Sequence, residues 1–196
     1  EYFINYFTHQ SDITIDLRDI STKIHKKRAE PWTITLVDTG ENTMTGGRLA
    51  RVMDHVADEE QFFFTYGDGV GNIDIDACLN FHKAHGKLAT LTAVRPPGRF
   101  GALEVVGDRV SSFIEKPSGD GGKINGGFFV LSPKVIELIT GDDCVWEQDP
   151  LKKLASRGEL FSYQHEGFWQ PMDTLRDKLY LESLWQSGAA PWKIWK

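Results

Sequence analysis

Short and almost continuous runs of apolar residues constrain the fold of this chain more than any other feature. Residues 61–66 (QFFFTY) and 88–94 (LATLTAV) each end at a glycine- or proline-rich turn, and residues 127–131 (GFFVL) have the same character. Runs of this length are typical of strands that are buried on both faces. A further run, residues 32–37 (WTITLV), is β-branched and precedes the turn Asp38-Thr39-Gly40, so it also predicts a strand.

Helical patterns lie between these runs. Apolar residues recur at helical spacing in residues 47–56 and 74–85. Further helices are predicted at residues 133–139, 150–156 and 174–187, with Ser132 as N-cap and Pro133 at the first position of the first of them. Residues 102–106 and 109–115 flank Gly107-Asp108 and predict a β-hairpin.

This alternation of strands and helices predicts an α/β fold, a Rossmann-like mixed, mostly parallel sheet with helices on both faces. Because no repeat or clear linker divides the sequence, we expect a single domain over residues 1–196. The chain opens with Glu1 in EYFINYF, as though inside an element, so we also expect a segment upstream.

Charge and cysteine content narrow the function classes. The 28 Asp and Glu residues exceed the 22 Lys and Arg residues, which argues against a nucleic acid or an anionic membrane surface as the main partner. No apolar stretch approaches the roughly 18 residues of a membrane span. The two cysteines, Cys78 and Cys144, cannot form a disulfide framework and suit a reducing cytoplasm.

One aspartate follows a predicted strand, and another precedes a predicted helix. Asp68, in Tyr66-Gly67-Asp68-Gly69, follows a buried run, at the sheet edge where ligands of open α/β sheets bind. Its carboxylate suits a magnesium ion that bridges phosphates, and the alternative is a plain turn. Asp173, in FWQPMDT, is a second candidate for the same ion, and its simplest alternative role is the N-cap of the following helix.

Three other segments are candidates for binding. Glu115-Lys116-Pro117 ends a predicted strand and offers a cation to a phosphate, or is only a solvated charged pair. Asn125-Gly126-Gly127 can bring an amide and bare backbone to sugar hydroxyls, although a bulge or hairpin explains the glycines equally well. Thr45-Gly46-Gly47-Arg48 leads into a helix whose first N–H groups would point at an anion.

Together these segments resemble the sugar-nucleotide pyrophosphorylases, most closely the members that act on glucose 1-phosphate with CTP. The similar runs include YGDG, EKPSGDGGKINGGFFVLSP, VDTGENTMTGGRL, PPGRFGALEV and GFWQPMDTLRDK, and the resemblance covers the chain from Glu1 to Lys196. It implies a nucleotide-diphospho-sugar transferase fold and transfer of a cytidylyl group from CTP to α-D-glucose 1-phosphate. The products are CDP-glucose, a precursor of dideoxysugars in bacterial O-antigen lipopolysaccharide, and pyrophosphate.

The resemblance also implies roles for individual residues. Asp68 and Asp173 match the aspartates that hold Mg²⁺, and with Lys116, which matches the lysine at the sugar phosphate, they are the expected catalytic residues. The expected contact to the phosphate of the sugar phosphate is Lys116, and those to the sugar hydroxyls are Glu115, Asn125 and Gly126. The expected nucleotide contacts are Thr43, Arg48 and Gly67. The implied partners are these two small-molecule substrates and, in a homo-oligomer, further copies of the chain.

One part of the family pattern is not found in residues 1–196. The family's first strand, its glycine-rich loop of the type GGxGTRL and its PKPM lysine, which grip the triphosphate, have no match in the sequence. We therefore expect residues 1–196 alone to be inactive. Two alternatives stay open: a sister nucleotidylyltransferase with another base or sugar phosphate, and a catalytically silent sugar-nucleotide-binding subunit.

Overall fold

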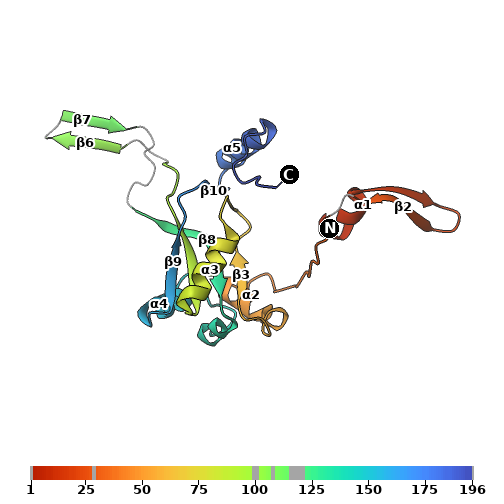
Figure 1. Cartoon of the computed structure of the whole chain (residues 1–196), viewed down its shortest axis with the longest axis horizontal. Helices are drawn as coiled ribbons and strands as arrows, with labels where there is room; N and C mark the ends of the chain where they lie inside the picture. Colours follow the sequence, from red (N-terminus) through yellow and green to blue (C-terminus); the bar gives the residue numbers. More distant parts are fainter. Residues whose placement is uncertain (1, 28–29, 99–101, 107–108, 115–121, 196) are drawn as a thin grey trace. The chain divides into compact units, whose positions relative to one another are not determined.

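The computed structural model describes residues 2–27, 30–98, 102–106, 109–114 and 122–195 (Figure 1). The chain divides into two compact units, Glu1–Asp38 and Thr39–Lys196. The single domain expected over residues 1–196 stays a prediction.

The first unit consists of a helix and a hairpin. Its elements are α1 (Tyr2–His9), β1 (Ser11–Asp16) and β2 (Ser21–Lys27), and the two strands pair in antiparallel fashion. The strand predicted at residues 32–37 is wrong, because this segment has no regular structure and most of its side chains are exposed. β-branched residues favour a strand only where a partner backbone completes the ladder, and within the described residues this segment pairs with none.

The second unit contains a four-stranded mixed sheet. Its order is β3 (Phe62–Thr65), β8 (Ile124–Leu131), β5 (Ala89–Val94) and β9 (Leu160–Gln164). β5 runs parallel to β9, whereas β8 runs antiparallel to both β3 and β5. The predicted α/β class and mixed sheet are confirmed. Parallel pairing is less extensive here than the sequence pattern predicts, because β8 opposes both of its neighbours.

Two smaller pairs of strands complete the β structure. β4 (Gly69–Gly71) pairs with β10 (Trp169–Pro171), and β6 (Ala102–Val106) pairs with β7 (Arg109–Ile114), both in antiparallel fashion. The second pair confirms the predicted hairpin, whose turn Gly107-Asp108 lies outside the described residues.

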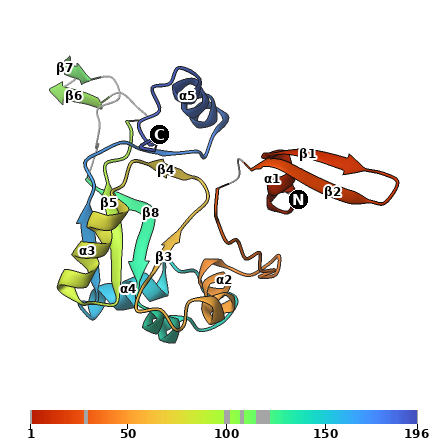
Figure 2. The ribbon, with the colours of Figure 1, turned by 45° about the vertical axis from the view of Figure 1, so that its right-hand side comes forward.

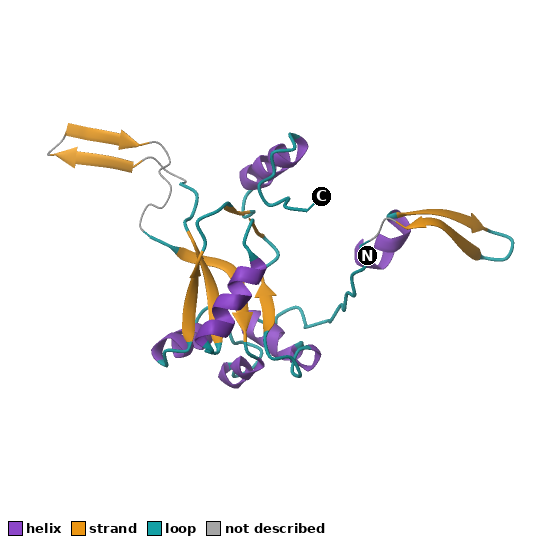
Figure 3. Cartoon of the chain, viewed as in Figure 1, coloured by secondary structure: helices purple, strands orange, loops and turns teal. Residues whose placement is uncertain are grey.

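The helices follow the sequence pattern closely (Figure 3). They are α2 (Thr45–Arg51), η1 (Met53–His55), α3 (Ile75–His85), η2 (Pro133–Leu138), α4 (Asp149–Ser156) and α5 (Leu175–Gln186), where η marks a 3₁₀ helix. The Asp74 carboxylate caps α3 by accepting the Ala77 N–H. Ser132 caps η2 as predicted. None of the helices within the described ranges combines the length and the apolar character that a membrane crossing requires.

Helices pack on both faces of the sheet. On one face, Phe129 and Leu131 of β8 are buried against Trp146, Leu154 of α4 and Val135 of η2. Burial of each large apolar side chain contributes about 1.5–3 kcal/mol, so this cluster makes β8 a rigid base. On the other face α3 lies along β5 (Figure 2). Alternate residues of a strand point to opposite sides, so the sheet can pack against helices on both faces.

The contact between α3 and β5 includes two histidines that share one buried threonine. The Lys87 N–H donates to His85 Nδ1, so the His85 Nε2–H donates to Thr90 Oγ1 (2.7 Å). The Thr90 hydroxyl therefore donates to His82 Nδ1 (2.9 Å). Because both Nδ1 atoms accept hydrogen bonds, this network assigns a neutral ring to each histidine. Burial, and then the neighbouring His85, lowers the pKa of His82 to about 4.

This arrangement predicts an acid-sensitive contact. The folded-state pKa of His82 lies below the ordinary value of about 6.5, so the unfolded chain binds this proton more readily. The contribution of neutral, buried His82 to the free energy of unfolding is on the order of 1–3 kcal/mol. It is present in full above about pH 6.5 and is lost as the pH falls toward about 4. Urea unfolding at pH 7 and pH 5 should show a smaller pH-dependent loss of stability in His82→Gln than in the wild type. The exposed His55→Gln is the control, and an equal loss in all three proteins would contradict the assignment.

Candidate active site

The short β4–β10 ladder brings the two candidate aspartates together. In its register Pro171 lies opposite Gly69, and the Met172 N–H donates to the Asp68 carbonyl oxygen (2.7 Å) one step further along. Asp68 therefore directly precedes β4, and Asp173 lies two residues after the end of β10. Both aspartates lie at the same end of the ladder.

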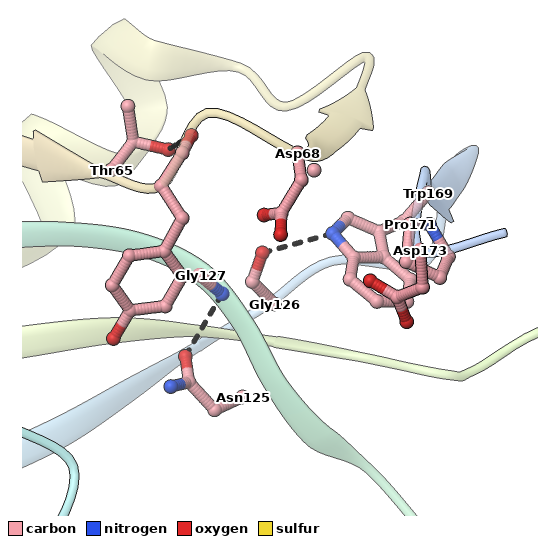
Figure 4. A pocket seen from close by; sticks show the side chains of 10 residues that line it. Thr65, Asp68, Asn125, Gly126, Gly127, Trp169, Pro171 and Asp173 are labelled. Carbon is pink, nitrogen blue, oxygen red and sulfur yellow. Dashed lines mark hydrogen bonds between the residues drawn. The ribbon is translucent and has the colours of Figure 1, made fainter. Parts of the chain in front are cut away.

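A pocket opens at this end of the ladder (Figure 4). Its lining residues are Thr65, Tyr66, Asp68, Gly69, Asn125, Gly126, Gly127, Trp169, Pro171 and Asp173. The cavity measures about 230 Å³, smaller than the roughly 300–1,000 Å³ of typical ligand sites. It is therefore sized for one part of a substrate, and it combines two carboxylates from the ladder with an amide and backbone groups from β8.

The interpretation of Asp173 as a helix cap is wrong. The N-cap of α5 is Thr174, whose hydroxyl accepts the Asp177 N–H, while the Asp177 carboxylate accepts the Thr174 N–H in return. This reciprocal capping box satisfies the start of the helix. The Asp173 carboxylate is therefore not needed for the cap, and it lines the pocket instead.

Asn125, Gly126 and Gly127 form a bulge in β8. The pairing with β5 shifts between Leu91 and Ala93, and Gly127 has a left-handed φ of 78° that favours glycine. Asn125 Oδ1 accepts the Gly127 N–H (2.9 Å), which stabilises this conformation. A Cβ at Gly126 would lie 2.7 Å from Val94 Cγ1, so the close approach of β5 also requires glycine. The glycines thus have a structural role whether or not a sugar binds.

Tyr66 forms one wall of the pocket. Its ring packs against Gly127, where a Cβ would lie 2.8 Å from the tyrosine Cδ2. Burial raises the pKa of the phenol well above its usual range, and the Glu147 carboxylate nearby raises it further. Tyr66 is therefore a neutral hydroxyl at physiological pH.

The expected anion site at Thr45-Gly46-Gly47-Arg48 is not supported by the structure. The N–H groups of Gly46 and Gly47 both donate to the Cys144 carbonyl oxygen (2.9 and 3.3 Å). The first turn of α2 therefore binds the segment around Cys144 and not an anion.

The other candidate residues that the structure describes do not line this pocket. Thr43 is buried, and the exposed Arg48 donates from its guanidinium to Thr39 Oγ1 (2.6 Å) and to the Glu41 carbonyl oxygen (2.9 Å). Gly67 precedes Asp68 without lining the pocket. Glu115 and Lys116 lie outside the described residues, so their roles stay predictions.

Sequence reasoning did not single out several lining residues, of which Trp169 is the most informative. Its indole N–H donates to the Gly126 carbonyl oxygen (2.9 Å). The motif FWQPMDT holds this tryptophan four residues before Asp173, but an apolar side chain in such a motif gives no signal of a hydrogen bond to a distant glycine.

Comparison with known proteins identifies the family. Residues 13–170 match the nucleotidyl transferase family. The chain belongs to this family. The match includes β4, the bulge of β8 and the first two residues of β10, and it confirms the resemblance found in the sequence motifs.

Two similar curated relatives are named for the same activity. The chain is 62% identical over its whole length to glucose-1-phosphate cytidylyltransferase of Salmonella typhi, and it covers 76% of that protein. It is 39% identical, again over its whole length, to the probable glucose-1-phosphate cytidylyltransferase of Bacillus subtilis, of which it also covers 76%.

Solved structures support the same fold. A putative glucose-1-phosphate thymidylyltransferase from Bacillus anthracis in complex with a sucrose aligns with a TM-score of 0.58 at 17% identity, over 80% of this chain and 65% of that one. HddC from Yersinia pseudotuberculosis aligns with a TM-score of 0.52 at 24% identity, over 71% and 61%.

The bulge predicts which glycines of the site can be replaced. Gly126→Ala and Gly127→Ala should each lower the free energy of unfolding by about 1–3 kcal/mol, because the new Cβ meets Val94 or the Tyr66 ring. Gly67→Ala should stay within about 0.5 kcal/mol of the wild type, since nothing lies within 4 Å of its Cβ. Urea denaturation measures all three. Equal stability of the three variants would contradict the described bulge.

Proposed function

We propose that this protein transfers a cytidylyl group from CTP to α-D-glucose 1-phosphate, giving CDP-glucose and pyrophosphate. The observation that carries the proposal is a pocket with Asp68, Asp173 and Asn125 in a nucleotidyl transferase chain that is 62% identical to a glucose-1-phosphate cytidylyltransferase. We also propose that residues 1–196 belong to one catalytic domain, since the family match over residues 13–170 includes parts of both compact units.

The reaction is a displacement at phosphorus. A phosphate oxygen of glucose 1-phosphate forms a bond to the α-phosphorus of CTP, while the bond from that phosphorus to the bridging β-phosphate oxygen breaks and pyrophosphate leaves. Such reactions depend mainly on positioning the reactants and on neutralising their charge. Side chains that hold a cation and a sugar in fixed relation therefore account for most of what the protein contributes.

Asp68 and Asp173 are the residues that would hold the divalent cation, which we propose to be Mg²⁺. Within the described ranges no group of three or more His, Cys, Asp or Glu side chains gathers around one point. A pair of carboxylates nevertheless fits magnesium, which usually takes one or two from the protein and completes its shell with water and phosphate oxygens. When bound, the ion neutralises charge on the phosphates.

Asn125 and Gly126 would bind the sugar from β8. Because Asn125 Oδ1 already accepts the Gly127 N–H, the amide NH₂ is the group that can donate to a sugar hydroxyl. Glu115 and Lys116 complete the sugar phosphate site in this proposal. Thr43, Arg48 and Gly67 remain the proposed nucleotide contacts, although none of them lines this pocket.

The assembly and the location of the protein belong to the same proposal. We expect a homo-oligomer, which light scattering of the purified protein measures. We place the reaction in the cytoplasm, and both cysteines, Cys78 and Cys144, are buried and free, as a reducing compartment allows.

Pyrophosphate release tests this function directly. The protein expressed from its complete gene should release pyrophosphate with glucose 1-phosphate and CTP faster than with UTP, dTTP, ATP or GTP. Preference for another nucleotide would assign the chain to a sister enzyme. Binding of CDP-glucose without turnover of any nucleotide would favour the catalytically silent subunit.

Removing either carboxylate should abolish most activity without loss of stability. Asn keeps the shape of Asp but loses the charge that magnesium needs, so Asp68→Asn and Asp173→Asn should each lower kcat by at least about a hundredfold. The melting temperature without metal should change little, because Thr174 caps α5. The exposed Asp58→Asn, on a loop outside the pocket, is the matched control. Full activity of both variants would exclude the two-aspartate site.

Lys116 should act on the sugar phosphate and not on the nucleotide. Lys116→Ala removes a charge-assisted phosphate contact worth roughly 1.5–3 kcal/mol, so the KM for glucose 1-phosphate should rise about ten- to a hundredfold. Steady-state kinetics with each substrate varied in turn makes the measurement. A raised KM for CTP with an unchanged KM for glucose 1-phosphate would place the lysine at the other substrate.

A further inference from the structure

An indole N–H links the ladder that carries both aspartates to β8 of the four-stranded sheet. The Trp169 Nε1–H donates to the Gly126 carbonyl oxygen at 2.9 Å, from β10 to β8 (Figure 4). A Cβ at Gly69 of β4 would lie 3.6 Å from both bonded atoms, so this glycine lies beside the bond. All three residues line the pocket, so the hydrogen bond is part of its wall.

The acceptor of this bond is held firmly on the side of the sheet. Gly126 is buried, and β5 approaches it so closely that a Cβ would lie 2.7 Å from Val94 Cγ1 and 3.1 Å from the Thr92 carbonyl oxygen. The hydrogen bond from Gly127 to Asn125 fixes the bulge around it. The carbonyl oxygen is therefore a fixed point to which the ladder can attach.

The ladder itself is less constrained. It has three residue pairs, and isolated two-stranded ribbons are marginally stable at best. Its own register fixes Asp68 relative to Asp173. The chain before Asp68 is also tied to β8, because the Tyr66 N–H donates to the Gly127 carbonyl oxygen (3.3 Å). The indole bond gives β10, the strand before Asp173, a link of its own to β8.

We propose that Trp169 is a positioning residue for the transfer reaction. Its indole N–H holds the carboxylate end of the pocket at a set distance from the sugar end, so that the phosphate oxygen and the α-phosphorus meet in line. The inference rests on the proposed function, because it assigns the cation to Asp68 and Asp173 and the sugar to Asn125. The alternative is that the indole ring only packs, in which case its N–H is dispensable.

Replacing Trp169 by 3-benzothienylalanine tests the N–H alone. This residue keeps the size and shape of tryptophan but has sulfur in place of the N–H, so the variant should fold and keep its melting temperature. Since small misplacements of reacting groups are costly, kcat should fall about ten- to a hundredfold. The KM values for both substrates and the Kd for Mn²⁺ should stay within about twofold, because each end of the pocket remains intact. The same replacement at the half-exposed Trp185, outside the pocket, should leave kcat unchanged.

A second readout does not require activity. Mn²⁺ bound in place of Mg²⁺ broadens NMR signals steeply with proximity, so the broadening of the ¹⁵N-labelled Asn125 amide reports the distance between the two ends of the pocket. It should differ between the wild type and the benzothienyl variant at position 169, but not in the variant at position 185. Unchanged kcat together with unchanged broadening in the variant at position 169 would overturn the proposal. A lower melting temperature together with raised KM values for both substrates would overturn it too. A wild type that neither binds Mn²⁺ nor releases pyrophosphate would instead defeat the proposed function.

Discussion

The antiparallel pairing of β4 with β10 is the constraint on which the site depends. It joins residues 69–71 to residues 169–171, a hundred positions further along the chain, so that residues on either side of the pairing share one pocket. Its last backbone hydrogen bond, from Met172 to Asp68, leaves both carboxylates at one end. The capping box at Thr174 then turns the chain directly into α5, which limits how far Asp173 can move.

The rest of the pocket depends on the rigidity of β8. One end of this strand is packed through Phe129 and Leu131 into the apolar core, and the other end carries the bulge with Asn125 and Gly126. A packed strand that ends in a bulge can present a bare carbonyl and an amide at a fixed place. The indole of Trp169 bonds the end of the pocket that we propose for the sugar to the strand that precedes Asp173.

Sequence reasoning succeeded where the pattern is local and failed where a distant partner decides. The apolar runs predicted β3, β5 and most of β8, and the apolar spacing predicted α3. Residues 32–37 have strand propensity, yet no described strand pairs with them. The N–H groups of Gly46 and Gly47 satisfy the carbonyl of Cys144, far along the chain, which no local motif reveals. Spacing identified Asp68 and Asp173 as separate candidates, and the family resemblance, not the periodicity, paired them.

Anomalous scattering from manganese tests the central claim most directly, namely that the pocket between the ladder and β8 is where the cation and the sugar phosphate meet. Crystals of the protein from its complete gene, soaked with Mn²⁺ and CDP-glucose, should show an anomalous peak within about 2.5 Å of carboxylate oxygens of both Asp68 and Asp173, a generous bound for a hard cation. The glucose ring should lie within hydrogen-bond reach of the Asn125 amide. A manganese peak bound elsewhere, with CDP-glucose outside the pocket, would contradict the account.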